Sequence, residues 1–385
     1  MMLSEASREI VKATVPVLEA HGTEITRVFY RNMFADHPEL LDIFNQANQS
    51  QGRQQTALAA TVLAAAKHID RLEDLLPEVV HIAHKHRALQ VKPEHYPIVG
   101  EYLLGAIKEV LGEAATPEIL AAWGEAYGAI AGVFTGVEKE MYQQAAWPDF
   151  AEFTVTGKRQ TGSDIVEFTV SPLAVKLPEI QAGQYITVQV RPQPGAHLAL
   201  RHYSICSTDT AGGLKFAVKR DNGNGHCGVV SNYLHDRIAV GDVLKLSAPA
   251  GDFLWQNGQN PVVFLSAGVG ITPILAMLQA QLAADDAREI IWVHAAADEA
   301  AQAFKEESAA LLDQARHAVS HVFYSRKGER ITQEWLKENT PENATVYLCG
   351  SMAFMDSMAG IFESFARPQQ TVCFEPFGPK MSVAV

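Results

Sequence analysis

The chain has 385 residues, of which 48% are hydrophobic and 19% are charged, a composition typical of a globular protein with two or three domains rather than of a disordered one. Its formal net charge of −13 and its pI near 5.5 argue against nucleic acid or an anionic membrane as the main partner, because either would bind a basic face.

Neither the N-terminal stretch nor the cysteines indicate export. The stretch MMLSEASREIVKATVPVLEAHG mixes acids and bases without an apolar core, unlike a signal peptide, and no segment approaches the ~18 apolar residues of a membrane span. Cys206, Cys227, Cys349 and Cys373 form no CxxC pair, which excludes a cysteine-spaced zinc site, an iron–sulfur cluster and covalent c-type haem attachment. We therefore expect a reduced, cytoplasmic protein.

Residues 1–142 are rich in Ala and Leu with helical periodicity, which predicts an all-α domain of about six to eight helices. Prolines that suit the first turn of a helix recur along it: Pro38, Pro77, Pro93 and Pro117. Residues 143–150, QQAAWPDF, break the pattern and are predicted to be a linker.

Three histidines stand close together in HIAHKHRALQV, residues 81–91. At about 100° per residue, His86 falls on the apolar helix face of Val79 and Leu89, whereas His81 and His84 point away from it. The spacings lack the two histidines four apart, with a glutamate between them, of the familiar zinc motif. A single histidine on an apolar face is by itself more often a core residue than a ligand.

Residues 151–257 alternate in short runs such as AEFTVTGKR, DIVEFTVSP, QYITVQVRP, LKFAVKR and VLKLSAP, separated by Gly and Pro. This period of two predicts an antiparallel β-barrel. Residues 258–385 change again, because apolar strands such as PVVFLSA, EIIWVHAAA, HAVSHVFYS and ATVYLCG are separated by helical segments. That alternation predicts an α/β domain with a parallel sheet that binds a nucleotide.

GVGITP, residues 268–273, lies where a strand leads into a helix. Gly268 and Gly270 let the backbone approach a pyrophosphate, Thr272 is expected to cap the helix, and Pro273 suits its first turn. The stretch, with Val269 and Ile271 between these residues, would present free N–H groups to the anion. A proline replaces the third glycine of the common dinucleotide fingerprint, a departure that resembles the ferredoxin reductase group.

RHYS, residues 201–204, resembles the flavin motif of the same group. The resemblance implies that Arg201 pairs with the flavin diphosphate, that Tyr203 packs on the isoalloxazine, and that the Ser204 hydroxyl approaches the reactive ring nitrogen. His202 stands within the motif, and Tyr185 of GQY lies upstream as in that group.

Two further stretches extend this resemblance. GVVSNYLH supplies a second glycine-led helix start through Gly228, Val229, Val230 and Ser231, with Ser231 expected near the FAD phosphates. YLCGSMAFM matches the segment that carries a cysteine, here Cys349, beside the nicotinamide. Each piece alone fits an ordinary turn or strand, but four in this order indicate a reductase that moves a hydride from NAD(P)H to FAD. Because no iron–sulfur motif follows, the helical domain is the expected one-electron acceptor.

An electron-accepting helical domain without cysteine clusters favours His86 as a ligand to haem iron. Tyr30 lies beside Phe29 and Phe34, and Gln54 lies on an apolar stripe of its helix, so both are candidates for the same pocket. Each alone has a structural explanation, but together they are suitable hydrogen-bond donors to oxygen on the side opposite His86.

Across its whole length the chain resembles the flavohaemoglobins, also called flavohemoproteins: a globin domain (1–142) and a linker (143–150) followed by an FAD barrel (151–257) and an NAD(P) domain (258–385). The resemblance makes His86 the proximal haem ligand and Lys85 a residue linked to the haem and flavin potentials. It makes Tyr30 and Gln54 the distal residues, and Tyr96 and Glu138 the partners of the proximal histidine. Glu138 also falls on the apolar side of the last helix by its own periodicity, whereas Glu140 suits a solvated face.

CFEPFGP, residues 373–379, resembles the end of that family and places Glu375 near the flavin with Phe377 beside it. Pro376, Gly378 and Pro379 complete the stretch, and Pro376 stands where cysteine is common in the family.

The resemblance implies haem b, FAD and NADH or NADPH as cofactors, and a nitric oxide dioxygenase that converts NO and O2 to nitrate. It also suggests a lipid or azole-type ligand in the haem pocket. The alternatives are an NAD(P)H-dependent flavin reductase of ferric iron, quinones or lipid hydroperoxides, and a haem-based oxygen or NO sensor or store. The choice between NADH and NADPH stays open, since Ser325 and Arg326 suit either a 2′-phosphate site or an ordinary loop.

Overall fold

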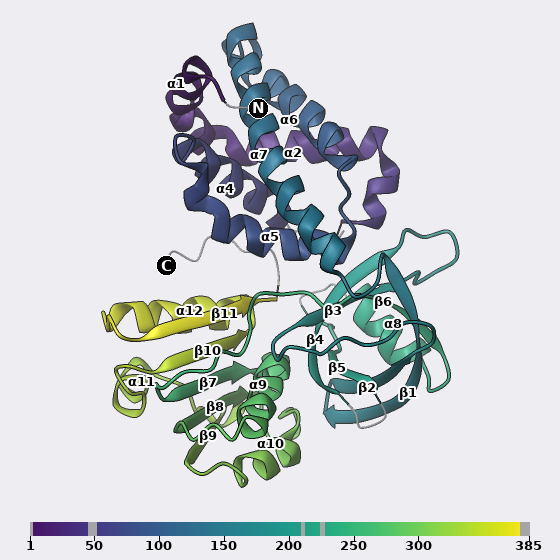
Figure 1. The fold of residues 1–385 in the computed structure, drawn as a ribbon, viewed down its shortest axis with the longest axis vertical. Coiled ribbons are helices and arrows are strands. Elements are labelled where there is room, and N and C mark those ends of the chain that lie inside the picture. The colour runs from purple at the N-terminus through teal and green to yellow at the C-terminus, as the bar shows by residue number, and fades with distance from the viewer. Residues whose placement is uncertain (1–2, 45–51, 209–211, 224–227, 378–385) are drawn as a thin grey trace. The chain divides into compact units, whose positions relative to one another are not determined.

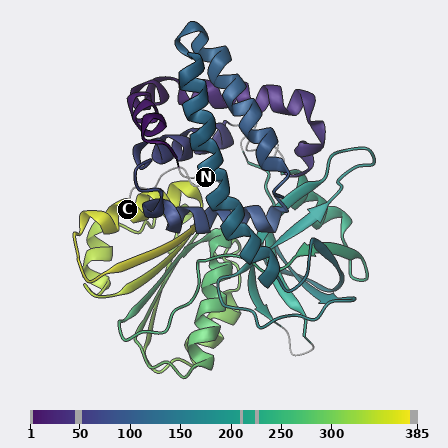
Figure 2. The same cartoon turned by 45° about the horizontal axis from the view of Figure 1, so that its top comes forward.

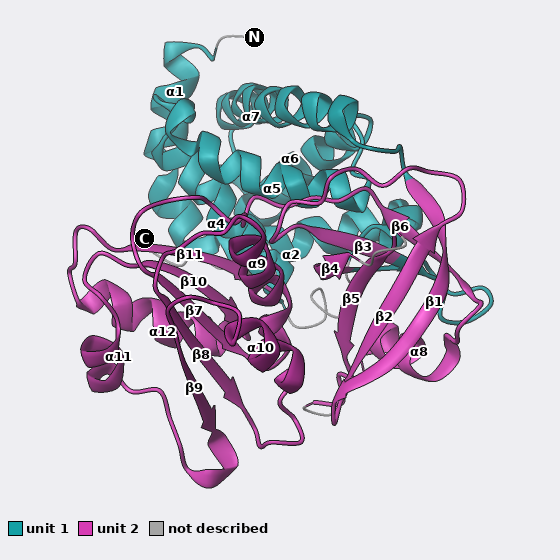
Figure 3. Cartoon of the chain, turned by 60° about the horizontal axis from the view of Figure 1, so that its bottom comes forward, with its two compact units in different colours: residues 1–149, 189–201, 379–382 teal, residues 150–188, 202–378, 383–385 magenta. Residues whose placement is uncertain are grey.

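The computed structural model describes residues 3–44, 52–208, 212–223 and 228–377, and divides into two compact units (Figure 3). The first unit comprises residues 1–149, 189–201 and 379–382, and the second comprises residues 150–188, 202–378 and 383–385.

The first unit is helical over its N-terminal part, as the periodicity predicted (Figure 1 and Figure 2). Its α-helices are α1 (Glu5–Ala13), α2 (Val15–Asp36), α4 (Arg53–Lys67), α5 (Leu76–Leu89), α6 (His95–Leu111) and α7 (Pro117–Gln144). Short 3-10 turns are η1 (Pro38–Asp42), η2 (Leu72–Leu75) and η3 (Gly112–Ala114).

Prolines begin several of these helices, because the first turn leaves N–H groups unpaired and proline lacks one. Pro38 begins η1, Pro117 begins α7, and Pro77 is the second residue of α5. The prediction for Pro93 was wrong. It lies in a turn two residues before α6, whose first residue is His95.

The core of the first unit surrounds α2, which packs against α4 and α6. Ile25, Phe29 and Met33 are buried on one stripe of α2, as helical spacing requires. The α6–α7 contact is close at Gly100, where an added Cβ would lie 2.6 Å from the ring of Tyr127.

The second part of the chain begins with a closed six-stranded barrel in the order β1-β2-β5-β4-β3-β6. Its strands are β1 (Phe150–Gly162), β2 (Ile165–Pro172), β3 (Tyr185–Val190), β4 (Ala199–Thr208), β5 (Leu214–Lys219) and β6 (Val243–Ser247), and helix α8 spans Val229–Arg237. The described pairings of β1 with β2 and β6, and of β5 with β2 and β4, are antiparallel, as predicted.

A parallel sheet in the order β11-β10-β7-β8-β9 follows (Figure 1). Its strands are β7 (Val262–Ala267), β8 (Ile290–Ala296), β9 (Ala318–Tyr324), β10 (Thr345–Gly350) and β11 (Thr371–Pro376). The helices are η4 (Gly268–Gly270), α9 (Ile271–Ala283), α10 (Lys305–Leu312), η5 (Ser325–Lys327), α11 (Gln333–Asn339) and α12 (Met352–Ser364).

Alternate residues of the sheet enter two different cores. Phe264 and Trp292 pack with residues of α9, whereas Val263 and Val293 pack with residues of α11 and α12. Because the strand order reverses between β7 and β10, the carboxyl ends of these two strands form the edge at which such sheets bind nucleotides.

The barrel and the sheet share one core within the second unit. Ile165 and Ala217 of the barrel belong to the same buried cluster as Phe264 and Ile274 of the α/β part. Across the described segments of the whole chain, no helix has the length and apolar character needed to cross a bilayer.

Candidate active site

Helix α5 places His86 one turn before its C-terminal end. The helix ends at Leu89, its C-cap Gln90 has a left-handed φ of 65°, and the N–H of Val91 donates to the carbonyl of His86 at 2.9 Å. The His86 ring lies 5.7 Å, centroid to centroid, from that of Phe134 in α7. Its side chain remains 31% exposed, so part of the imidazole is accessible to a ligand.

Two side chains hold the imidazole from one side. The Nδ1 atom of His86 lies 2.7 Å from Oε1 of Glu138 and 3.2 Å from the hydroxyl of Tyr96, and the Tyr96 hydroxyl donates to the same Glu138 oxygen at 2.6 Å. Because a carboxylate only accepts, Nδ1 carries the hydrogen and Nε2 keeps a lone pair for a metal. The structure thus brings together three of the residues singled out in the sequence.

Glu138 is 2% exposed, whereas Glu140 is exposed, as the helical periodicity predicted. Burial, together with the hydrogen bond to Glu138, raises the pKa of Tyr96 well above its ordinary value, so the phenol stays a neutral donor. The second carboxylate oxygen, Oε2, is buried without a hydrogen-bond partner among the described residues. Among the described residues, the carboxylate therefore accepts hydrogen bonds from the imidazole and the phenol, both at Oε1.

Two tyrosines that sequence reasoning missed support this arrangement from α7. The Tyr127 hydroxyl donates to the carbonyl of Tyr96 at 2.6 Å, and the Tyr142 hydroxyl donates to the carbonyl of Val91 at 2.7 Å. Both tyrosines share a helical face with Phe134 and Glu138, and that shared spacing was a signal that could have found them.

Tyr30 is buried in α2 within an aromatic cluster. Its ring stacks on Phe34 at a centroid distance of 5.6 Å and meets Phe29 and Phe44 edge-on at 4.7 and 5.8 Å. Burial raises the pKa of Tyr30 well above its ordinary value, so the hydroxyl is a neutral donor. Among the residues that the structure describes, none hydrogen bonds to it, which leaves it available to a ligand.

Gln54 is half-buried in the first turn of α4, and Lys85 is half-buried beside His86 in α5. His81 and His84, on the same helix, are half-buried as well. The geometry therefore distinguishes His86 from the other two histidines by its contacts with Glu138 and Tyr96, rather than by burial.

The RHYS stretch occupies strand β4. The Arg201 guanidinium is half-buried and donates to the carbonyl of Leu200 at 2.7 Å. The ring of Tyr203 stacks on Phe216 with centroids 5.5 Å apart, so one ring face is already covered by protein. Ser204 is buried with 7% exposure.

Tyr185 and His202 lie together on neighbouring strands of the barrel. Their ring centroids are 4.8 Å apart, and Nδ1 of the exposed His202 lies 2.8 Å from the Thr187 hydroxyl. Gly251 has a φ of +114°, and an added Cβ there would lie 3.0 Å from the Tyr185 ring. Glycine at 251 therefore makes room for the tyrosine.

Helix α8 begins with Gly228 as its N-cap. A Cβ at this residue would lie 2.7 Å from both the Cβ of Asp221 and the hydroxyl oxygen of Ser231, so the close approach requires glycine. The Ser231 hydroxyl donates to the carbonyl of Gly228 at 3.1 Å. Val230 is buried, but Val229 is 56% exposed, an unusual apolar exposure at a helix N-terminus.

The glycine turn η4 leads from β7 into α9. Gly268 has a φ of +53°, and a Cβ on Gly270 would lie 2.4 Å from the carbonyl oxygen of Cys349 in β10. The cap predicted for Thr272 was wrong, because Gly270 is the N-cap and the Thr272 hydroxyl donates to the carbonyl of Val269 at 2.9 Å. Ile271, Thr272 and Pro273 are all buried in the first turn.

The ends of β10 and β11 lie beside this turn. Cys349 is fully buried, and its thiol lies 3.6 Å from the carbonyl oxygen of Glu375, its partner in the strand register. Burial raises the pKa of Cys349 far above the ordinary value, so the sulfur is a neutral packing group. Glu375 is buried and Phe377 is 40% exposed. Gly378, Pro379 and the side chain of Pro376 lie outside the described residues.

A buried polar pair in β7 and β8 escaped the sequence analysis. The Ser266 hydroxyl lies 2.8 Å from Nδ1 of His294, and both residues are fully buried. Burial lowers the pKa of His294 to about 4, so its ring is neutral at pH 7. The signal was a histidine in the otherwise apolar strand IIWVHAA.

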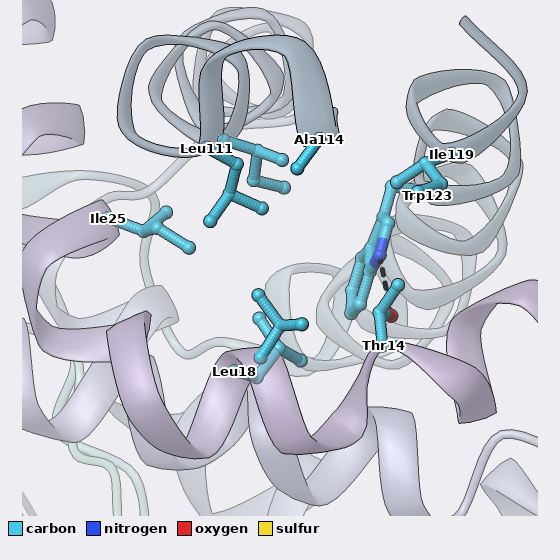
Figure 4. A pocket seen from close by; sticks show the side chains of 9 residues that line it. Thr14, Leu18, Ile25, Leu111, Ala114, Ile119 and Trp123 are labelled. Carbon is cyan, nitrogen blue, oxygen red and sulfur yellow. Dashed lines mark hydrogen bonds between the residues drawn. The ribbon is translucent and has the colours of Figure 1, made fainter. Parts of the chain in front are cut away.

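A cavity of about 60 Å³ lies elsewhere in the first unit (Figure 4). It is lined by Thr14, Val17, Leu18, Ile25, Ile107, Leu111, Ala114, Ile119 and Trp123. Trp123 Nε1 donates to the Thr14 hydroxyl at 3.1 Å, drawn as a dashed line in the figure. The lining uses the first half of α2, whereas Tyr30 is in the second half, and it contains no acid or base. The cavity is therefore distinct from the site around His86.

Three family models match successive parts of the chain. The Globin model matches residues 27–134, the Oxidoreductase FAD-binding domain matches residues 152–255, and the Oxidoreductase NAD-binding domain matches residues 264–359. A protein of Halalkalibacterium halodurans named Flavohemoprotein is 44% identical over 404 residues, which cover 99% of this chain and 98% of the relative. The chain belongs to the flavohemoprotein family.

Two solved structures with related names have folds similar to that of this flavohemoprotein. The flavohemoglobin of Malassezia yamatoensis, with bound FAD and heme, matches 98% of this chain and 100% of its own at a TM-score of 0.88 and 28% identity. The FAD/NAD-binding domain of the nitric oxide dioxygenase of Vibrio cholerae matches 60% of this chain and 100% of its own, with a TM-score of 0.55 and 29% identity. As a flavohemoprotein, the chain is an NAD(P)H-dependent oxidoreductase with haem and FAD as cofactors.

The residues of this flavohemoprotein suit these groups. When Nδ1 of His86 carries the hydrogen that it donates to Glu138, Nε2 has none, and its lone pair can bind haem iron. The N-termini of α8 and α9 each begin at a glycine whose Cβ would collide with neighbouring atoms, and free N–H groups at such ends suit a pyrophosphate.

Proposed function

We propose that this flavohemoprotein is a nitric oxide dioxygenase that converts NO and O2 to nitrate with electrons from NAD(P)H. The observation that carries the proposal is the hydrogen-bonded contact of Glu138 and Tyr96 with His86 in a chain that also matches FAD- and NAD-binding domains. The Vibrio cholerae relative that bears this activity in its name supports the choice. When bound, haem supplies the reaction of O2 with NO, and FAD converts a hydride into single electrons.

On the proximal side, His86 holds the iron through Nε2 while its Nδ1–H donates to Glu138. A carboxylate acceptor makes the imidazole a stronger electron donor, which favours oxygen chemistry over reversible storage. Tyr96 donates to the same oxygen at 2.6 Å and holds the carboxylate in the orientation that accepts from the ring. Lys85, next to His86, is proposed to influence the haem and flavin potentials.

Tyr30 and Gln54 are the side chains that would donate hydrogen bonds to bound oxygen and so offset negative charge on it. The proposal is supported by the burial of Tyr30, the neutral state of its phenol and the absence of a partner for it among the described residues. Phe29, Phe34 and Phe44 surround the ring of Tyr30 with apolar surface. The same apolar wall is proposed to accept a lipid or azole-type ligand.

In the reductase module, Arg201 binds the flavin diphosphate, Tyr203 packs on the isoalloxazine and Ser204 directs its hydroxyl to the reactive ring nitrogen. Residues 228–231 and 268–273 would hold the phosphates of FAD and of NAD(P)H respectively through the backbone N–H groups that remain free there. Pro273 has no N–H, and those of Gly228 and Ile271 already donate to backbone carbonyls. The flavin and nicotinamide sites would be completed by Tyr185, His202, Cys349, Glu375 and the segment 376–379.

We also propose the domain boundaries and the location of the protein. The globin domain spans residues 1–142, the linker 143–150, the FAD domain 151–257 and the NAD(P) domain 258–385. The proposed location is the cytoplasm.

The proposal is tested with a matched pair of histidine variants. His86→Ala should lose haem and nitrate formation while FAD content and NADH-driven reduction of an added one-electron dye persist, because haem and flavin are bound by different domains. His84→Ala, on the same helix, should keep haem and nitrate formation. Full haem content in His86→Ala, with an unchanged absorption spectrum, would reject the ligand assignment. A flavin reductase alone would show dye reduction but no nitrate in any variant.

A further inference from the structure

Thr26 in α2 joins that helix to α4 through a hydrogen bond. Its side chain is 2% exposed, and its hydroxyl oxygen lies 2.9 Å from the carbonyl oxygen of Gln55 in the first turn of α4. Within its own helix the hydroxyl also lies 3.1 Å from the carbonyl of Gly22 and 3.2 Å from that of Thr23. A hydroxyl has one hydrogen to donate, and the shortest of the three contacts is the one between the helices.

A second contact fixes the direction in which the two helices run. The Cβ position of Gly22 lies 3.5 Å from Cβ of Ala59, one turn away from the contact of Thr26 with Gln55 on each helix. The two helices therefore pack antiparallel. Of the two contacts, that of Thr26 is nearer to Gln54, at the beginning of α4. It is also nearer to Tyr30, which lies one turn after Thr26 in α2.

The first turn of α4 begins at a glycine cap. Its N-cap is Gly52, in the left-handed conformation with φ of 72°, and the Thr56 hydroxyl donates to the Gly52 carbonyl at 3.1 Å. Glycine has no side chain that could accept from the first N–H groups of the helix. The hydroxyl of Thr26 supplies a tether from another helix at the third residue of α4, directly after Gln54.

We propose that Thr26 is a positioning residue for the oxygen-binding side of the haem pocket. By holding the carbonyl of Gln55, it fixes the spacing between Gln54 on α4 and Tyr30 on α2, so that both donors point at one ligand. The inference rests on the distal roles of Tyr30 and Gln54 proposed above. It adds a residue that does not contact the ligand and acts through the relative placement of two helices.

The test compares Thr26→Val, which keeps the shape but removes the hydroxyl, with Thr26→Ser, which keeps the hydroxyl. The measurements are the rate of oxygen dissociation and the C–O stretching band of the carbon monoxide complex, on haem-replete full-length protein. In Thr26→Val, oxygen should dissociate roughly 3- to 10-fold faster, because one of the aligned donors is lost for part of the time. The C–O band should split or broaden. Thr26→Ser should resemble the unmodified protein in both.

The same measurements in a Tyr30→Phe background separate this inference from the proposed function. If Thr26 acts through Tyr30, adding Thr26→Val there should change the oxygen rate much less than it does in the unmodified protein. Unchanged rates and bands in Thr26→Val, while Tyr30→Phe alters both, would overturn the role of Thr26 and leave that of Tyr30 standing. An equal effect of Thr26→Val in both backgrounds would also overturn it. A Tyr30→Phe variant indistinguishable from the unmodified protein would reject the proposed distal role itself.

Discussion

Replacing Gly270 by alanine should damage the nucleotide end of the reductase while leaving the globin part intact. The new Cβ would lie 2.4 Å from the carbonyl oxygen and 2.6 Å from the carbonyl carbon of Cys349, and 2.7 Å from Cα of Gly350. These are backbone atoms, so no flexible side chain can move aside. Ordinary contact begins near 3.4 Å, and the turn η4 with the start of α9 must therefore move from β10 by about 1 Å.

That displacement sets the expected magnitudes. Overpacking of this kind costs about 1–3 kcal/mol of folding free energy, which should lower the melting temperature of the second unit. A misplacement of about 1 Å in a group that positions a substrate slows the chemical step by up to roughly 100-fold. We therefore expect the hydride transfer from NADH to FAD to slow by about 10- to 100-fold.

The assay is stopped-flow reduction of FAD by NADH without oxygen, with the oxygen dissociation rate of the globin part as an internal control. Gly360→Ala, in α12, is the matched variant, because its added Cβ has no neighbour within 4 Å. It should reduce flavin normally and gain up to about 1 kcal/mol of stability from better helix propensity. Unaltered flavin reduction and melting in Gly270→Ala would refute the reasoning.

Three further outcomes are expected. Tyr30→Phe removes a donor worth about 1–3 kcal/mol in a water-poor pocket, so oxygen should dissociate about 5- to 150-fold faster and nitrate formation at low oxygen should fall, whereas equal values would exclude Tyr30 from the site. Ser204→Ala should slow flavin reduction more than it weakens FAD binding, and an unchanged stopped-flow rate would reject the proposed role of its hydroxyl. Because burial lowers the pKa of His294 from an ordinary 6.5 to about 4, the unfolded chain binds a proton there first. Stability should thus be full above pH 6.5 and fall toward pH 4 by up to about 3 kcal/mol, and His294→Gln should flatten that part of the melting profile.

Sequence periodicity predicted the local structure best where one face of an element is buried. Glu138 is the clearest case, since its spacing from Phe134 placed a carboxylate on the apolar side of α7, and the structure buries it there. The same reasoning separated it from the exposed Glu140. The barrel and the parallel sheet followed from the change of period between residues 151–257 and 258–385.

Strands that depend on distant partners were harder to predict. Strand β4 mixes arginine, histidine and serine with apolar residues, so no clean alternation marks it, and strand β11 is short and ends at a proline. Both form because neighbouring strands pair with them, β5 with β4 and β10 with β11. Such pairing depends on contacts across many residues of sequence, which local patterns do not encode.

In the candidate site, too, the sequence identified residues, whereas their contacts had to come from the structure. The family resemblance made Tyr96 and Glu138 the partners of His86, and the packing of α5, α6 and α7 brings the three side chains into hydrogen-bonding distance. Thr272 was wrongly expected to cap α9, because the glycine turn ends at Gly270 and the helix already begins at Ile271, so the Thr272 hydroxyl donates back to the carbonyl of Val269. The spacing of Tyr127 and Tyr142 places them on the helical face of Glu138, but the backbone carbonyls to which they and Thr26 donate are known only from the folded chain.

The central claim is that both atoms of one O2 molecule enter the nitrate formed from NO. The reaction balances as two NO, two O2 and one NAD(P)H giving two nitrate, NAD(P)⁺ and one proton. The most direct measurement supplies unlabelled NO, NADH and ¹⁸O2 to the holoenzyme and weighs the nitrate by mass spectrometry. Dioxygenation predicts nitrate with two ¹⁸O atoms per molecule and two nitrate per NADH consumed. Nitrate without paired label, or consumption of NADH without nitrate, would contradict the account.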